Sequence, residues 1–192
     1  VTFTERFPGS QPVFFQVTIQ SDGAAQYRTI ERPGQPSLRL GFTAPRLAAR
    51  IFALTRELHD FRRPRLESGH RVGDMGAKTL AYDDGAQHTQ QAFNFTTVRA
   101  AAELNQIFQG ISTASEDALR LERSIRYDPL GVISALNQVG RDWEQDQISS
   151  PRPLLPVLRR AAANPNLMNI ARRRARLLIH MMTAAHGRRH GL

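Results

Sequence analysis

The sequence contains no cysteine, which excludes disulfide bonds, thiolate metal sites and a cysteine nucleophile. It also lacks an uninterrupted apolar run long enough to cross a bilayer, for which a helix needs about 20 apolar residues. Aromatic residues make up only 7% of the chain, and none follows Trp143. Because hydrophobic residues at 41% and charged residues at 22% are close to globular averages, we predict a soluble chain with one ordinary core or two small ones.

Lysine is almost missing, and acidic residues are missing from the C-terminal end. Of 26 basic residues only Lys78 is a lysine, a usage typical of a GC-rich genome, so arginine enrichment alone is weak evidence for nucleic-acid binding. Residues 151–192 contain nine arginines and no Asp or Glu, which equals the whole net charge of +9. Residues 115–147 carry seven acids against four arginines. We therefore predict an acidic helical region beside a basic C-terminal end.

The tripeptide Asp-Gly-Ala occurs twice, at Asp22-Gly23-Ala24 and at Asp84-Gly85-Ala86. Each copy lies between two runs in which apolar and polar residues alternate. Because glycine tolerates the positive φ of a tight primed turn, these patterns predict β-hairpins over residues 13–31 and 77–93. The same acids could suggest a calcium or phosphate loop, but turn formation explains them without a ligand.

Each predicted hairpin leads into a helix that opens on the pattern Phe-Thr-x-x-Arg-x-Ala, from Phe42 and from Phe95. Thr43 and Thr96 suit the N-cap position, where a hydroxyl accepts a free backbone N–H. Apolar residues recur at helical spacing after both, so each helix has a stripe to bury. Two ββα units in tandem predict an α+β fold over residues 13–112: a four-stranded, mainly antiparallel sheet with two helices on one face.

Residues 113–192 are predicted to form an all-helical segment with a basic C-terminal end. In its last helix we expect one side to be buried and the other to be mostly exposed. The predicted buried side holds Leu167, Ile170, Ala171, Ala175, Leu177, Leu178, Met181 and Met182, and the other side holds Arg172, Arg173, Arg176 and His180. The predicted helices begin at these signals: a capping box from Thr113 to Glu116, Asp128-Pro129, Ser150-Pro151, and Asn164 or Asn166.

Two family resemblances bear on these segments. The stretch "PLLPVLRRAAANPNLMNIARRRARLLIHM" resembles a HEAT-type helical repeat, with an apolar first helix, an Asn-Pro turn and an arginine-rich second helix; such repeats present surfaces to other proteins. Residues 13–111 are similar, in their order of hairpin, turn and helix, to exported bacterial domains built from a ββα duplication and to the emfourin-type protein inhibitors of metalloproteases. This resemblance implies an extracytoplasmic protein that acts by docking, and no inhibitory residue carries over.

No catalytic signature is present. The six histidines form no His-Glu-x-x-His pattern, and the chain has neither a glycine-rich phosphate loop nor a Gly-x-Ser-x-Gly motif. Asp74, Asp83 and Asp84 are close in sequence, but Asp83 and Asp84 belong to a predicted solvent-facing turn. We predict that the protein is not an enzyme and has no catalytic residue, no cofactor and no metal site.

The basic end allows three interpretations. Its arginines could solvate the outer face of a core helix, or pair with carboxylates such as those in residues 115–147 of a neighbouring copy. They could also bind the phosphates of nucleic acid or lipid. The lack of aromatic residues near them disfavours base stacking.

Residues 1–12 are predicted to form an extended arm bearing Phe3 and Phe7, which adds to a free sheet edge of its own or of an adjacent copy. The chain begins with Val1 rather than methionine. Removal of a signal peptide would explain that start, so we expect an extracellular or periplasmic protein.

Together these features predict a non-catalytic exported or cell-envelope protein that acts by protein association, including self-assembly into an oligomer or filament. The alternatives are a secreted protease inhibitor and a module that binds an anion, either nucleic acid or another polyanion. The predicted partner, in the first case, is protein, most simply copies of the chain itself, with no transmembrane segment. The predicted partner-binding residues are Arg152, Arg159, Arg160, Arg172, Arg173, Arg174, Arg176, Arg188, Arg189, Phe3 and Phe7.

Overall fold

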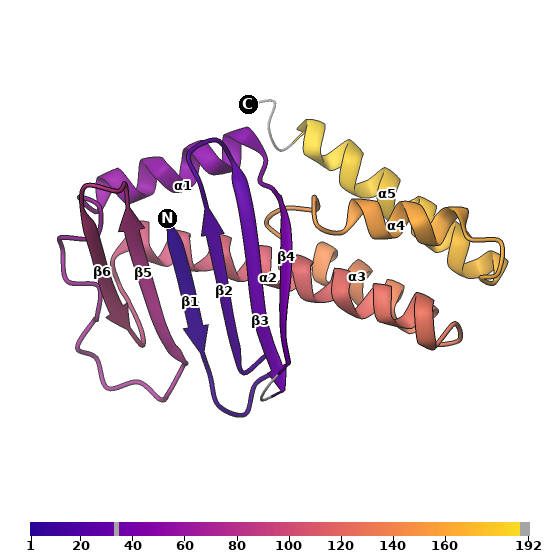
Figure 1. The fold of residues 1–192 in the computed structure, drawn as a ribbon, viewed down its shortest axis with the longest axis horizontal. Coiled ribbons are helices and arrows are strands. Elements are labelled where there is room, and N and C mark those ends of the chain that lie inside the picture. The colour runs from indigo at the N-terminus through magenta and orange to yellow at the C-terminus, as the bar shows by residue number, and fades with distance from the viewer. Residues whose placement is uncertain (33–34, 189–192) are drawn as a thin grey trace. The chain divides into compact units, whose positions relative to one another are not determined.

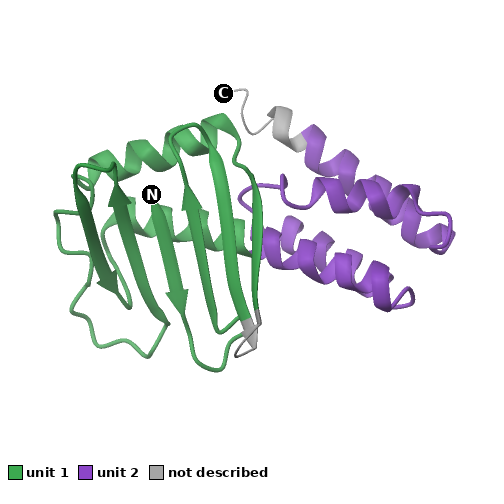
Figure 2. Cartoon of the chain, in the orientation of Figure 1, with its two compact units in different colours: residues 1–112 green, residues 113–192 purple. Residues whose placement is uncertain are grey.

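A computed structural model describes residues 1–32 and 35–188 of the chain, with backbone alone for residues 31, 32, 35 and 185–188. The chain folds into two compact units, residues 1–112 and 113–192 (Figure 2). The first unit is a sheet with two helices, and the second is helical. Helix α2, Arg99–Tyr127, runs across the division between them.

In the described residues, the first unit forms one six-stranded sheet in the order β4-β3-β2-β1-β5-β6, with every neighbouring pair antiparallel (Figure 1). The α+β class, the antiparallel pairing and the helical C-terminal part agree with the prediction, but the sheet is larger than the four strands expected. The strands are β1 Thr2–Arg6, β2 Phe14–Ile19, β3 Ala24–Arg32, β4 Gln35–Phe42, β5 Ala77–Asp83 and β6 His88–Phe93.

Strand β1 lies at the centre of the sheet, between β2 and β5. Its Phe3 faces Val17 on one side and Leu80 on the other, and its side chain is fully buried. Residues 2–6 are thus extended and pair within the chain's own sheet, one of the two predicted alternatives, but they form a central strand and not a separate arm at a free edge. The alternation of apolar and threonine side chains at the start of the chain forms an internal strand because β5, more than seventy residues later, supplies its second partner.

The two predicted hairpins are confirmed as β2–β3 and β5–β6. Gly23 and Gly85 have φ of +87° and +85°, the left-handed region that glycine adopts without steric cost. Asp22 Oδ1 accepts a hydrogen bond of 2.8 Å from the Ala24 N–H, which fixes the first turn. The Asp-Gly pairs are thus turn residues, and the ββα description fails only because β1 and β4 add a strand on each side of the first hairpin.

Helices α1, Pro45–Glu57, and α2 cover the same face of this sheet (Figure 1). The Phe108 ring of α2 stacks on Phe3, with centroids 5.3 Å apart. The Arg50 guanidinium of α1 donates two hydrogen bonds of 2.6 Å to the Glu103 carboxylate of α2. The helices and the sheet thus enclose one apolar layer, as a sheet with a single buried face requires.

The predicted N-cap at Thr43 is not used, whereas the Thr96 hydroxyl accepts a backbone N–H as predicted, although α2 begins only at Arg99. Helix α1 begins at Pro45, and its N-cap residue, Ala44, makes no side-chain cap bond. The Thr43 N–H instead donates to Gly23 O at 2.8 Å, which extends the pairing of β3 with β4 by one residue. Thr96 Oγ1 accepts from Val98 N at 3.2 Å, ahead of the first residue of α2.

Two charged side chains lie on the covered face of the sheet, where Glu5 of β1 is paired with Lys78 of β5. Lys78 Nζ donates to the carbonyls of Gly76 at 3.1 Å and Asn94 at 3.2 Å, and also to Met75 O. Burial lowers the pKa of Lys78, and the nearby Glu5 carboxylate opposes that shift. The only lysine of the chain therefore satisfies backbone carbonyls at the start of β5.

The helical unit packs the end of α2 with α3, Val132–Glu144, α4, Leu155–Ala163, and α5, Asn169–Arg188. The predicted helix start at the Thr113–Glu116 capping box is wrong, because α2 continues through it. Ala114, Ala118 and Leu121 extend the buried stripe at helical spacing, so no break is needed.

Helix α5 buries a narrower side than the sequence predicted. Its buried residues are Ala171, Ala175, Leu178 and Met182, which contact α3 and α4. Ile170 and Leu177 are 56% and 48% exposed, so their predicted burial is wrong. The small alanines allow the neighbouring helices to pack closely against this face. With the alanines turned inward, the larger side chains of Ile170 and Leu177 point outward.

Candidate protein-association edge

Strand β4 is an edge of the sheet and exposes a row of large apolar side chains. Leu38, Leu40 and Phe42 are 62%, 73% and 64% exposed. Because alternate residues of a strand point to the same face, the three side chains form one stripe. Tyr27 on β3, paired with Arg39, is buried on the covered face, so the stripe lies on the opposite, open face. We call Leu38, Leu40 and Phe42 the β4 stripe.

The same three residues direct their backbone groups away from the sheet. Thr43 N donates to Gly23 O directly opposite it, and Val1 and Ile19 exchange two bonds of 2.9 Å across β1 and β2. In an antiparallel ladder, residues bonded to a given neighbour alternate with residues that are not. Ser37, Arg39 and Gly41 therefore bond to β3. Each residue of the β4 stripe points its N–H and C=O to the outer side of the edge.

The β4 edge has few of the features that usually block strand addition. Natural edges are often protected by charged side chains, prolines or bulges. Pro36 is the second residue of this strand, but no proline or charge interrupts the β4 stripe itself. The single charged residue there, Arg39, lies on the other face, opposite Tyr27. The stripe therefore combines exposed apolar surface with backbone donors and acceptors suited to another strand.

The opposite edge of the sheet, β6, is polar at the equivalent positions. The β5–β6 turn pairs Asp84 with Gln87, whose carbonyl accepts from Asp84 N at 3.3 Å. By the same alternation, the residues of β6 whose backbone faces outward are His88, Gln90 and Ala92, all exposed. The two edges thus differ in chemistry, and Gln90 is a natural counterpart of Leu40 for comparison.

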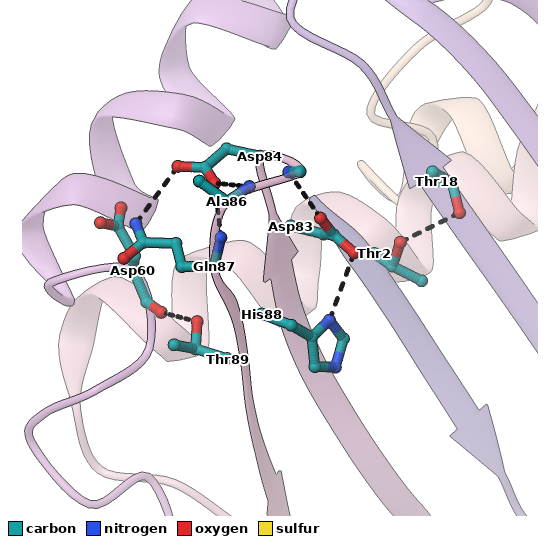
Figure 3. A network of polar contacts seen from close by, with 10 residues as sticks. Thr2, Thr18, Asp60, Asp83, Asp84, Ala86, Gln87, His88 and Thr89 are labelled. Atoms are coloured by element: carbon teal, nitrogen blue, oxygen red, sulfur yellow. Dashed lines mark hydrogen bonds and ion pairs between the residues drawn. The ribbon is translucent and has the colours of Figure 1, made fainter.

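A network of hydrogen bonds fixes the turn beside the β6 edge (Figure 3). The Asp84 carboxylate accepts from Gln87 N at 2.9 Å and from Ala86 N at 3.0 Å, and these bonds lower the pKa of Asp84. Asp83 lies 3.4 Å from the His88 imidazole. Asp83 and Asp84 thus serve the turn, as predicted, while Asp74 Oδ1 accepts from Gly76 N at 2.9 Å in its own loop.

The two phenylalanines predicted to bind a partner lie in different environments, one buried and one exposed. Phe3 lies in the core between sheet and helices, so its assignment to a partner surface is wrong. Phe7 follows β1 and is exposed, and its backbone N–H donates to Val13 O at 3.0 Å. Phe3 was misassigned because the same alternation fits a free arm and an internal strand.

The arginines predicted to bind a partner belong to the helical unit, and several form ion pairs or hydrogen bonds within that unit. Arg160 forms an ion pair with Glu122, Arg172 bonds Asn169, and Arg176 Nη2 donates to Ala162 O at 3.4 Å. The Arg174 guanidinium packs over Gly140, and Arg172 and Arg174 are half-buried. The exposed members of the set are Arg152, Arg159, Arg160, Arg173 and Arg176. The Arg188 side chain and Arg189 lie outside the described residues.

The acidic region offers less surface charge than the sequence predicted. Asp117 and Asp142 are buried, and Glu122 is held by Arg160. Gln138 Nε2 donates to both oxygens of Asp142, at 2.9 and 3.0 Å. Burial, reinforced by the neighbouring Asp142 carboxylate, raises the pKa of Asp117 to about 7. Ionic pairing between this region and the basic end of another copy therefore has fewer available carboxylates.

The described residues contain neither a metal site nor a membrane-spanning helix. Within 1–32 and 35–188, no group of histidine and acidic side chains could hold a metal ion. Over the same part of the chain, no helix has the length and apolar character needed to span a membrane. Comparison of the chain with protein-family models, curated proteins and solved structures finds no match.

Proposed function

We propose that this chain is a non-catalytic association protein that binds a protein strand at the β4 edge. The observation that carries the proposal is the coincidence, in Leu38, Leu40 and Phe42, of exposed apolar side chains with outward-facing backbone groups. In strand addition, main-chain hydrogen bonds provide affinity and alternate side chains provide specificity. The β4 stripe provides both on one short segment.

The expected energies favour this edge over the charged ends. Full burial of a leucine or phenylalanine side chain is worth about 1.5–3 kcal/mol relative to exposure, and each backbone bond adds about 1 kcal/mol net. Exposed ion pairs contribute only about 0–1 kcal/mol each and weaken with salt. Association must offset several kcal/mol of lost translational and rotational freedom. A contiguous apolar stripe can therefore support association better than exposed ion pairs can.

An exported or cell-envelope location remains part of the proposal, as predicted from the sequence. The alternative of a secreted protease inhibitor also remains a prediction, since the β4 edge alone does not favour a protease over another protein.

A polyanion-binding function is a second candidate, and a specific observation favours it. Arg152, Arg159 and Arg173 are exposed and make no ion pair or hydrogen bond with any residue that the structure describes. Such free guanidinium groups could bind phosphate or sulfate. Retention of the protein on heparin that falls in an Arg159→Gln, Arg173→Gln double variant would support it.

Backbone hydrogen exchange tests the main proposal. The amides of the β4 stripe are measured in dilute purified protein, in concentrated purified protein, and in labelled protein added to an extract of the cells that express it. Strand addition is expected to slow exchange of all three amides in at least one of the last two samples.

The Leu40→Arg variant should lose that protection because it places a charge in the stripe. The matched Gln90→Arg variant on β6 should keep it. Equally fast exchange of the three amides in every sample would overturn the proposal.

A further inference from the structure

We infer that the strand added at β4 is β4 of a second copy, paired antiparallel about a two-fold axis that passes beside Leu40. The inference rests on the proposed function of the β4 edge and names its partner and register. It is argued from three properties of the strand: the direction of its backbone groups, the spacing of its apolar side chains, and the position of its one charge.

The backbone direction allows this pairing. With the axis beside Leu40, this residue faces Leu40 of the second copy, and Leu38 faces Phe42. All three residues point their N–H and C=O to the open edge, so each facing pair can exchange two hydrogen bonds. No backbone group of β3 has to be released, because the bonds that join β3 to β4 involve the alternate residues.

The side chains are complementary in the same register. Leu40 meets its own counterpart, and Leu38 and Phe42 meet each other on both sides of the axis. The stripes of the two copies therefore join into one continuous row on the open face. Directly opposed aliphatic and aromatic side chains on one face of an antiparallel pair are favourable by about 0.2–1 kcal/mol per pair, beyond the gain from burial.

The charge on Arg39 selects this register over its neighbours. An axis beside Arg39 would set two arginines directly opposite each other and would leave Phe42 opposite Pro36. An axis beside Gly41 would leave Leu38 opposite Ala44, which lies beyond the end of the strand. The axis beside Leu40 places Arg39 opposite Gly41, where there is no like charge and no bulky side chain.

These requirements are met by β4 of a second copy but not by β6, the other edge strand of the sheet. A partner strand must offer three apolar side chains with outward backbone groups and a small residue opposite Arg39. Strand β4 meets this description itself, whereas β6 presents His88, Gln90 and Ala92. Because two-fold pairing uses the β4 edge of both copies, the assembly closes as a dimer and does not extend into a filament.

A single introduced cysteine tests the register, because the chain has no cysteine of its own. In a hydrogen-bonded antiparallel pair, facing Cα atoms are about 5.5 Å apart, within the range of disulfides. We expect Leu40→Cys to form a disulfide-linked dimer under mild oxidation, much faster than the matched Gln90→Cys variant on β6. The Gln90→Cys rate measures linkage by random collision between exposed edges.

Two further variants test whether Leu38 of one copy faces Phe42 of the other. Leu38→Cys and Phe42→Cys, each alone, should cross-link no faster than Gln90→Cys. An equal mixture of the two should form dimers that contain one chain of each, identified by intact mass. Leu40→Cys at the collision rate, or a faster reaction of Leu38→Cys with itself than with Phe42→Cys, would overturn the register.

The hydrogen-exchange samples separate failure of this inference from failure of the proposed function. Protection of the β4 stripe in concentrated purified protein, with a dimer by sedimentation, supports pairing of two copies. Protection only in the extract, with a purified monomer, overturns the inference and leaves strand addition in place. Fast exchange in all samples overturns both. Circular dichroism of each variant checks that it has folded.

Discussion

Asp117 and Asp142 lie side by side in the interior of the helical unit, where carboxylates are rarely found without a cationic partner. Arg120 contacts one oxygen of Asp117 at 3.2 Å, while the other oxygen is buried and has no hydrogen-bond partner among the described residues. Burial and the Asp142 charge raise the pKa of Asp117 from 3.8 to about 7. The Asp117 carboxyl is therefore best accommodated in its protonated form.

This pair predicts that acid stabilises the helical unit. Because the folded state binds the proton more tightly than the unfolded state, the free energy of unfolding falls as pH rises from about 4 to about 7. We expect a higher urea midpoint at about pH 5 than at about pH 8, and a smaller difference in Asp117→Asn, which cannot ionise. Glu144→Gln, an exposed change on α3, should keep the wild-type difference. An unchanged pH dependence in Asp117→Asn would contradict the role of this pair.

At the scale of elements, local signals located the hairpins but not the strand order. The Asp-Gly turns at Gly23 and Gly85 predict β2–β3 and β5–β6 because turn chemistry depends on a few adjacent residues. Strand β1 is placed by its pairing with the distant β5, for which no nearby residue is a signal. The fold class could thus be predicted from sequence, whereas the central position of β1 could not.

The candidate site was missed for a related reason. The alternation in "SLRLGF" could have indicated a strand, since Leu38, Leu40 and Phe42 recur every second residue. Such a pattern normally indicates a face turned to the core. Here β4 is an edge whose core-facing side carries Arg39, and only the strand order shows that the apolar side is open. The exposed stripe is a property of the tertiary structure.

Helix α5 gives a direct test of which helical face is buried. Ala175 is fully buried against the neighbouring helices, whereas Ile170 is more than half exposed. We expect Ala175→Leu to lower the free energy of unfolding by about 1–3 kcal/mol, because added methyl groups overfill a packed core. Ile170→Gln should change it by less than about 0.5 kcal/mol, as exposed substitutions do. Urea denaturation of both variants checks this, and a loss of more than about 1 kcal/mol in Ile170→Gln would restore the wider buried face predicted from sequence, which includes Ile170 as well as Ala175.

At the scale of the whole molecule, acidic and basic residues are separated along the sequence, but part of the acidic charge is buried or paired with arginine in the structure. The acidic residues of the helical unit are partly buried or held by arginine, as in Asp117, Asp142 and the Arg160–Glu122 pair. In the sheet unit, by contrast, the uncharged β4 stripe exposes three large apolar side chains. Association through backbone bonds and apolar side chains should therefore depend little on ionic strength.

Salt distinguishes the two routes to assembly. We expect the sedimentation coefficient of concentrated protein to correspond to a dimer at both about 0.1 M and about 1 M NaCl, where the screening length falls from about 10 Å to about 3 Å. The Arg159→Gln, Arg173→Gln double variant should keep the dimer at both concentrations, because neither residue belongs to the β4 stripe. Leu40→Arg should be monomeric at both. A dimer that dissociates at high salt, or in the arginine double variant, would instead assign assembly to the basic end of the chain and leave the β4 stripe without that role.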